Sequence, residues 1–101
     1  MSELNITEYV NLGRDLSGVL VPVGEEPALV IQNVSFTGTS VQSSAFNDKT
    51  RFVRLIADID TRIEFGINPT AGATKTNLPM GVAEYFGVKL GESLKVAAIQ
   101  L

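Results

Sequence analysis

Three carboxylates lie close together in the middle of the chain, at Asp58, Asp60 and Glu64. Asp58 and Asp60 are two positions apart, which places both side chains on the same face if this segment is a strand. With Glu64 across a turn, they could supply oxygen ligands to a hard cation. The acid-and-glycine pattern of an EF-hand loop is absent, and Arg54 and Arg62 lie nearby as counter-charges. The sequence therefore favours a solvated strand face with a turn aspartate over a metal site.

The residue types that most often carry catalysis are missing. The 101-residue chain contains no histidine, no cysteine and no tryptophan. Without cysteine there is no thiolate nucleophile, no disulfide and no thiolate-bound metal, and without histidine the usual general base is absent. Serines and threonines gather between residues 35 and 44, but no G-x-S-x-G motif surrounds them. We therefore expect a protein that is not an enzyme and that holds no metal and no cofactor.

Charge and hydropathy exclude two further classes of partner. The net charge is −3, and no cluster of Lys and Arg exceeds the pair Arg51 and Arg54, so nucleic acid is not an expected partner. Residues 1–50 hold two basic and six acidic side chains, while residues 51–101 hold six basic and five acidic ones. Such polarity favours contact between copies of the chain. No secretion signal and no apolar run of about 20 residues is present, so a membrane is not expected either.

The elements that position these residues are predicted to be strands. With 45% apolar residues the chain is too apolar to be disordered, and its length fits one domain. From about residue 19 the pattern has a period of two: Val30, Gln32, Val34 and Phe36 face inward in one strand, and Val53, Leu55, Ala57 and Ile59 in another. The pattern predicts two hairpins, over 52–65 and over 82–100, the latter around residues 89–92. Between them lies a loop over 66–81 with a short edge strand at 76–78.

Short strands separated by Gly and Pro indicate an all-β fold, a single antiparallel β-sandwich or barrel-like domain over residues 19–101. Residues 1–18 lack a clear period, because Tyr9, Val10 and Leu12 form no stripe and Gly13 interrupts them. We predict an extended N-terminal arm or edge segment there. An arm of this kind is the first place to look for a partner contact.

Four residues are predicted to form an interface. Phe52 and Ile56 point outward on the strand beginning at residue 52, so its outer face is half apolar. Tyr85 and Phe86 point to opposite faces, so one ring lies in the core and the other needs cover. A domain of about 100 residues is only marginally stable alone and has strand edges that must be covered. The predicted interface residues are Phe52, Ile56, Tyr85 and Tyr9.

Six short runs occur in an order that resembles a known group of proteins. They are SAFN and TRFVRLIAD at 44–47 and 50–58, IEFGINPTA at 63–71, LPMG at 78–81, EYFGV at 84–88 and KVAAI at 95–99. Together they resemble small proteins of the structural gene cassettes of tailed phages and prophages. The resemblance covers roughly residues 44–101.

The resemblance implies a virion component made in the host cytoplasm, with a β-sandwich domain and no catalytic residues. It implies most directly a head decoration (cement) protein, which binds and stabilises the phage head. The implied partners are the major capsid protein and other copies of the chain, as a trimer or dimer. Two alternatives stay open: a minor head or tail accessory protein, and a small β-sandwich module that binds carbohydrate.

Overall fold

The computed structural model describes residues 2–14, 16–89 and 91–100, apart from the side chains at positions 21 and 22. Within these residues the protein consists of strands and loops, so the all-β prediction is confirmed. None of the described residues forms a helix that could cross a membrane. The strands are β1 (Ser2–Tyr9), β2 (Leu12–Arg14), β3 (Leu20–Gly24), β4 (Val30–Phe36), β5 (Val41–Gln42), β6 (Phe52–Ala57), β7 (Thr61–Gly66), β8 (Thr76–Leu78), β9 (Glu84–Gly87) and β10 (Lys95–Gln100).

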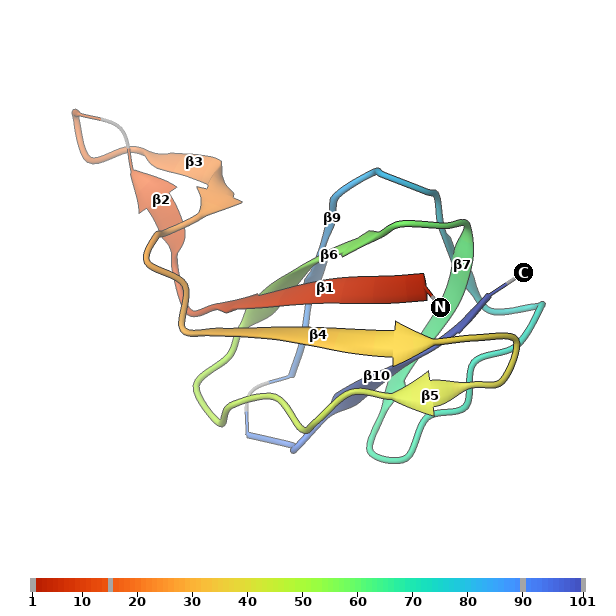
Figure 1. The fold of residues 1–101 in the computed structure, drawn as a ribbon. Helices are drawn as coiled ribbons and strands as arrows, with labels where there is room; N and C mark the ends of the chain where they lie inside the picture. The colour runs from red at the N-terminus through yellow and green to blue at the C-terminus, as the bar shows by residue number, and fades with distance from the viewer. Residues whose placement is uncertain (1, 15, 90, 101) are drawn as a thin grey trace.

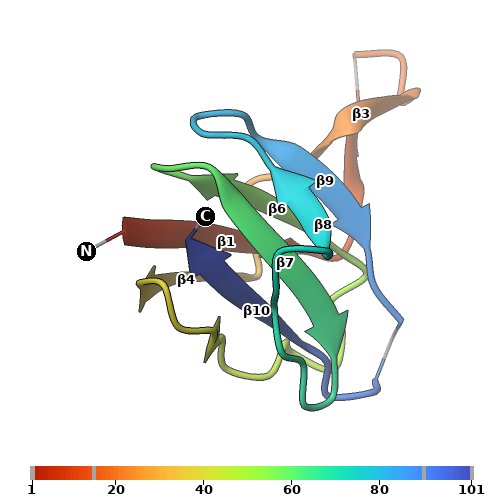
Figure 2. The same ribbon diagram turned by 90° about the vertical axis from the view of Figure 1, so that its right-hand side faces the viewer.

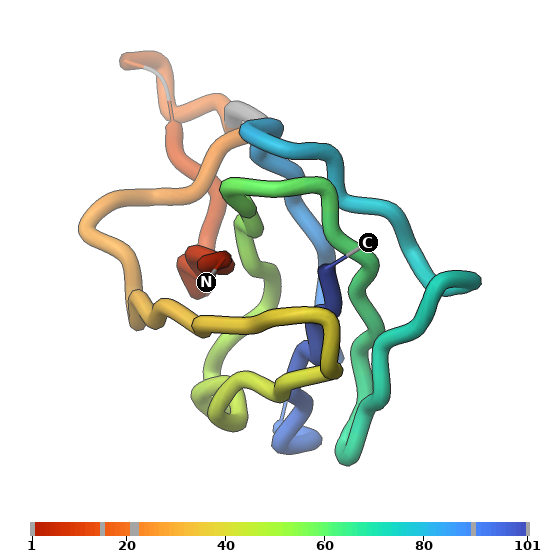
Figure 3. The backbone as a smooth tube through the Cα atoms, turned by 45° about the vertical axis from the view of Figure 1, so that its right-hand side comes forward, coloured from red at the N-terminus to blue at the C-terminus, as the bar shows by residue number. Residues whose placement is uncertain are grey.

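Two four-stranded antiparallel sheets pack face to face as a sandwich (Figure 1). The first sheet has the order β4-β1-β6-β9 and the second the order β5-β10-β7-β8. Figure 2 shows β10, β7 and β8 side by side in the second sheet. β2 and β3 form a separate two-stranded hairpin, which stands away from the sandwich in Figures 1 and 3.

The core lies between the two sheets and follows the predicted alternation. Val34 and Phe36 of β4 and Val53, Leu55 and Ala57 of β6 are buried there. They pack against Leu4, Ile6, Phe46, Ile63, Leu78, Val96 and Ala98. A period of two thus identifies the core face of each of these strands correctly.

The N-terminal segment differs from the predicted arm. Residues 2–9 form β1, an interior strand that pairs with β4 on one side and β6 on the other. The segment is an interior strand because Leu4 and Ile6 point into the core. The sequence pattern misses this strand because Glu8, a buried carboxylate, occupies the next inward position. The projecting element begins later, with the β2–β3 hairpin.

The two predicted hairpins are wrong in their pairing. β6 belongs to the first sheet and β7 to the second, so the chain crosses the sandwich at residues 58–60 instead of folding back in one sheet. β9 and β10 are divided in the same way. Leu90, in the predicted turn between them, lies outside the described residues. The short edge strand predicted at 76–78 is confirmed as β8, at the edge of the second sheet.

The outer faces of the two sheets are covered unequally. The loop after β7 folds back over the second sheet, because Gln42 Nε2 donates to Asn68 Oδ1 at 2.7 Å and to the Pro69 carbonyl at 2.9 Å. Ala97 of β10 lies outside the main core cluster yet has no exposed surface, which is consistent with cover from this loop. The first sheet has the β2–β3 hairpin over one end of its outer face, and beyond the hairpin Thr7 is buried while Asn5, Arg54 and Ile56 are half-buried.

Candidate functional site

The candidate site is the outer face of the first sheet, which we call the sheet face. It consists of the side chains that point away from the core: Glu3, Asn5, Thr7 and Tyr9 of β1, Ile31, Asn33 and Ser35 of β4, Phe52, Arg54 and Ile56 of β6, Tyr85 of β9, and Asp58 directly after β6. All four predicted interface residues lie on this face, although they come from three strands. The register brings them together, since Tyr9 pairs with Phe52, Asn5 with Ile56, and Arg54 with Tyr85.

Three aromatic rings gather at one end of the sheet face. Tyr9 stacks on Phe52 with a centroid distance of 5.3 Å, and Tyr85 lies 6.3 Å from Tyr9 and 6.0 Å from Phe52. Tyr85 is 40% exposed, but Tyr9 is only 1% exposed. Tyr9 is therefore an internal anchor in this chain rather than an open contact residue.

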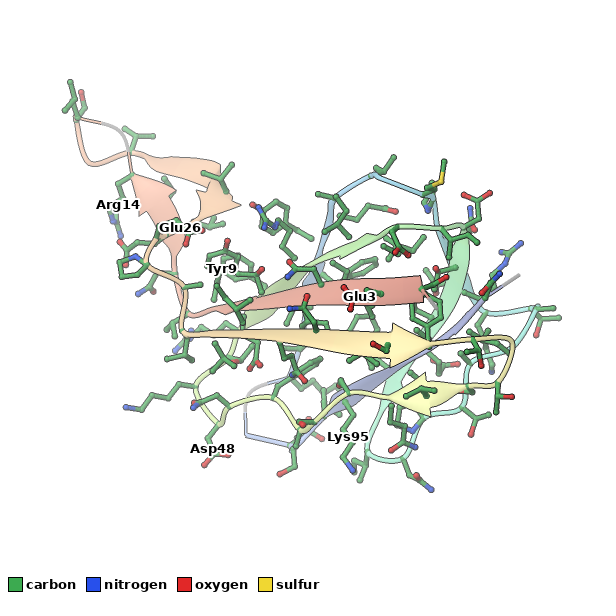
Figure 4. The ribbon with its side chains drawn as sticks, viewed as in Figure 1. Glu3, Tyr9, Arg14, Glu26, Asp48 and Lys95 are labelled. Carbon is green, nitrogen blue, oxygen red and sulfur yellow. The ribbon has the colours of Figure 1, made fainter. Side chains whose placement is uncertain are left out.

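The hairpin covers Tyr9 through two contacts at its base. The Tyr9 hydroxyl donates a hydrogen bond to Glu26 Oε2 at 2.5 Å, and Figure 4 shows both residues at the base of the hairpin. Gly24 lies directly on the Tyr9 ring, where a Cβ atom would collide with the ring carbons. Burial, and next the hydrogen bond to Glu26, raise the pKa of Tyr9 to about 12. The neutral phenol thus holds the hairpin to the sheet.

Polar side chains at the centre of the sheet face bond to one another. Asn5 Nδ2 donates to Asn33 Oδ1 at 3.0 Å, and Thr7 Oγ1 donates to Asn5 Oδ1 at 3.2 Å. Asn5 and Asn33 line a shallow hollow of about 370 Å³, together with Glu3, Ile56 and Asp58. The centre is therefore a shallow hollow whose amide side chains are partly satisfied by one another.

The three carboxylates considered for a metal do not converge. Asp58 Oδ1 accepts a hydrogen bond from the Glu3 amide at 3.0 Å, and Asp60 Oδ1 accepts one from the Met80 amide at 2.9 Å. Glu64 forms an ion pair with Lys75 at 3.0 Å. Across residues 2–14, 16–89 and 91–100, no three potential metal-ligating side chains gather.

The hairpin carries apolar side chains that the sequence pattern did not single out. Leu16 is fully exposed, Leu20 is 52% exposed and Val23 is 46% exposed. Gly18 at the turn has φ of 81°, which favours glycine, and Arg14 Nη1 donates to its carbonyl at 2.8 Å. The Ser-Gly dipeptide at 17–18 between two apolar segments was the signal for this turn.

Comparison of the chain with protein-family models, with curated proteins and with solved structures gives no match.

Proposed function

We propose that the protein is a non-enzymatic virion structural protein, a capsid decoration protein that binds the phage head through the major capsid protein and associates with further copies of itself. The observation that supports this most is the β2–β3 hairpin, which projects from the sandwich and exposes Leu16, Leu20 and Val23. A two-stranded hairpin is at best marginally stable on its own, and exposed apolar side chains gain about 25 cal/mol per Å² when a partner covers them.

Decoration of a capsid suits a small domain with two distinct contact surfaces. The hairpin extends the molecule, whose longest dimension is 45 Å against 27 and 21 Å for the other two. In this proposal the hairpin contacts the major capsid protein, and the sheet face remains available for a second copy. Binding to the lattice would also stabilise the folded chain, because a ligand that binds only the folded state shifts the folding equilibrium.

The test is binding of the purified protein to phage heads that lack it. We expect the wild-type protein to co-sediment with the heads and to occupy regular lattice positions by electron microscopy. The double variant Leu16→Ser/Leu20→Ser should lose at least tenfold in affinity. Ile67→Ser is the matched control, since Ile67 is 66% exposed but lies in the loop after β7. Absence of the protein from purified virions, or undiminished binding of the double variant, would contradict the proposal.

The same experiments separate the two alternatives. A minor head or tail accessory protein would appear at a few unique positions or on the tail rather than across the lattice. A carbohydrate-binding module would give hits on a glycan array. Of the three aromatic rings on the sheet face, only Tyr85 is well exposed, which gives a sugar ring little area for stacking.

A further inference from the structure

The charges on the sheet face are arranged so that the face of one copy is complementary to the same face of a second copy. Arg54, Ile56 and Asp58 occupy successive outward positions along β6 and just beyond its end, about 6.6 Å apart at the usual rise of a strand. Arg54 and Asp58 therefore lie at equal distances on either side of Ile56. A half-turn about an axis through Ile56, perpendicular to the strands and in the plane of contact, exchanges the two positions.

None of the three charged side chains of the sheet face, Arg54, Glu3 and Asp58, forms an ion pair among the described residues. Arg54 is the one cation among these three, and its Nε is buried without a hydrogen-bond partner. Asp58 is exposed and accepts one hydrogen bond, from the Glu3 amide. Each of the two has capacity for an opposite charge that its own chain leaves unused.

The polar side chains at the centre of the sheet face already satisfy part of one another's hydrogen-bonding capacity. Asn5, Asn33 and Thr7 are already linked by hydrogen bonds, so their dehydration costs less than that of free amides. Ile31 is 64% exposed, and Met80 and Val82, at the rim beside Asp58, are 61% and 47% exposed. These apolar side chains would gain from cover.

We propose that the sheet face pairs with the same face of a second copy about a two-fold axis that follows the row Asn33, Asn5 and Ile56. In this dimer Arg54 of each copy faces Asp58 of the other, and the two Ile56 side chains meet on the axis. An axis parallel to the strands is disfavoured, because it would bring Arg54 toward Arg54. The inference deepens the self-association part of the proposed function and rests on it.

The hairpins do not obstruct this arrangement. Each hairpin lies over the Tyr9 and Phe52 row, two rows from the axis, so the rotation brings it beyond the strand ends of the second copy. The sheet face, with its shallow hollow, contributes on the order of 400 Å² per copy, which is small for a specific interface. We therefore expect a weak, reversible dimer with Kd on the order of 10 μM.

Charge reversal tests the pairing directly, with sedimentation velocity between about 1 and 500 μM as the readout. Arg54→Asp and Asp58→Arg should each weaken the dimer at least tenfold, because each creates two like-charge contacts. An equimolar mixture of the two variants should form a heterodimer, and the double variant should form a homodimer again. Lys49→Asp and Asp48→Arg are the matched controls, since both residues are exposed in the loop before β6.

A chemical crosslink provides a second readout that does not depend on charge. The chain contains no cysteine, so Ile56→Cys introduces a unique thiol on the proposed axis. A bismaleimide of about 10 Å, the usual distance between packed sheets, should link two copies of this variant. Ile31→Cys, which is exposed but off the axis, should crosslink several-fold less.

Several outcomes would overturn the inference. They are a wild-type protein that stays monomeric at 500 μM, a trimer, a mixture of the two charge variants that fails to associate, or single variants that dimerise like the wild type. Unchanged urea midpoints for the variants would exclude misfolding as the cause. A monomer that still binds phage heads would contradict the dimer and leave the decoration proposal standing. A dimer that depends on Arg54 and Asp58 but does not bind phage heads would support the dimer and contradict the decoration proposal.

Discussion

Glu8 is a buried carboxylate that follows Leu4 and Ile6 in the inward row of β1, with 1% of its surface exposed. Its Oε1 accepts hydrogen bonds from the Asn47 amide at 2.8 Å and from Thr50 Oγ1 at 2.7 Å, and its Oε2 accepts one from Gln32 Nε2 at 3.3 Å. These donors come from β4 and from the loop before β6. A single side chain thus ties that loop to the first sheet, and its satisfied hydrogen bonds offset the cost of its burial.

Glu8→Ala should lower the free energy of unfolding by about 2–4 kcal/mol, because it leaves the Asn47 amide and the buried Thr50 hydroxyl without their acceptor. Glu8→Gln should cost roughly half as much, since its remaining oxygen can still accept from Asn47 and Thr50. Urea denaturation measures both values. Glu25→Ala, an exposed glutamate, should change stability by less than about 0.5 kcal/mol. Equal losses for Glu8→Ala and Glu25→Ala would contradict this role.

The raised pKa of Tyr9 predicts that the folded protein loses stability at alkaline pH. Its pKa is raised from 10.0 to about 12 in the folded chain, so the neutral phenol contributes stability in full below pH 10. That contribution, roughly 2–3 kcal/mol, is lost as the pH rises from 10 towards 12. Denaturation of the wild type and of Tyr9→Phe across this range should give converging stabilities. Absorbance titration of Tyr85→Phe, in which Tyr9 is the only tyrosine, should give a midpoint near 12.

The hairpin is the element that depends most on one residue, Gly24. Its Cα lies against the Tyr9 ring, and its amide lies 3.4 Å from the Tyr85 hydroxyl as a hydrogen-bond donor. The base of the hairpin is therefore a packed contact, while its tip is open to solvent.

Gly24→Ala should displace the hairpin from the sheet, because the added methyl group collides with the Tyr9 ring. We expect a loss of about 1–3 kcal/mol in stability, with faster proteolysis within residues 10–29. Gly38→Ala is the control, since nothing lies within 4 Å of a Cβ at that position. Wild-type protease resistance of Gly24→Ala would show that the contact is not needed to hold the hairpin.

The sequence predicts the positions of the strands better than it predicts which strands pair. The alternation in 30–36 and 52–57 identified which side chains are buried, because a period of two reports the face of a strand. It could not report that β6 and β7 lie in different sheets, since both point the same side chains into the shared core whether they pair or cross. The alternation also identifies the outward residues of β6 and β9. It carries no information on strand register, and so it does not predict that these residues lie beside Tyr9.

At the scale of the whole molecule, the loop after β7 covers part of the outer face of the second sheet, and the β2–β3 hairpin covers one end of the outer face of the first. Gln42 secures the loop through two hydrogen bonds, to Asn68 and Pro69. Each outer face is therefore partly covered by an element of its own chain.

Gln42→Ala should release the loop after β7. The loss of two hydrogen bonds should cost about 1–2 kcal/mol and should speed trypsin cleavage at Lys75 several-fold. Asn77→Ala, at an exposed position of β8, serves as the control for both measurements. Cleavage at an unchanged rate would indicate that the other contacts of the loop, such as the Ala71 amide donating to Ser40 Oγ at 2.9 Å and the Lys75–Glu64 ion pair, are sufficient to hold it.

The interior position of β1 affects the stage of folding at which the sheet face forms. Leu4 pairs with Val34 and with Ala57, which follow it by about 30 and about 50 positions, and such distant pairings form slowly. Asn5 and Ile56 become neighbours only when β6 has been added to β1. An incomplete or unfolded chain therefore carries no copy of the sheet face, and the proposed pairing between copies would be restricted to molecules that have finished folding.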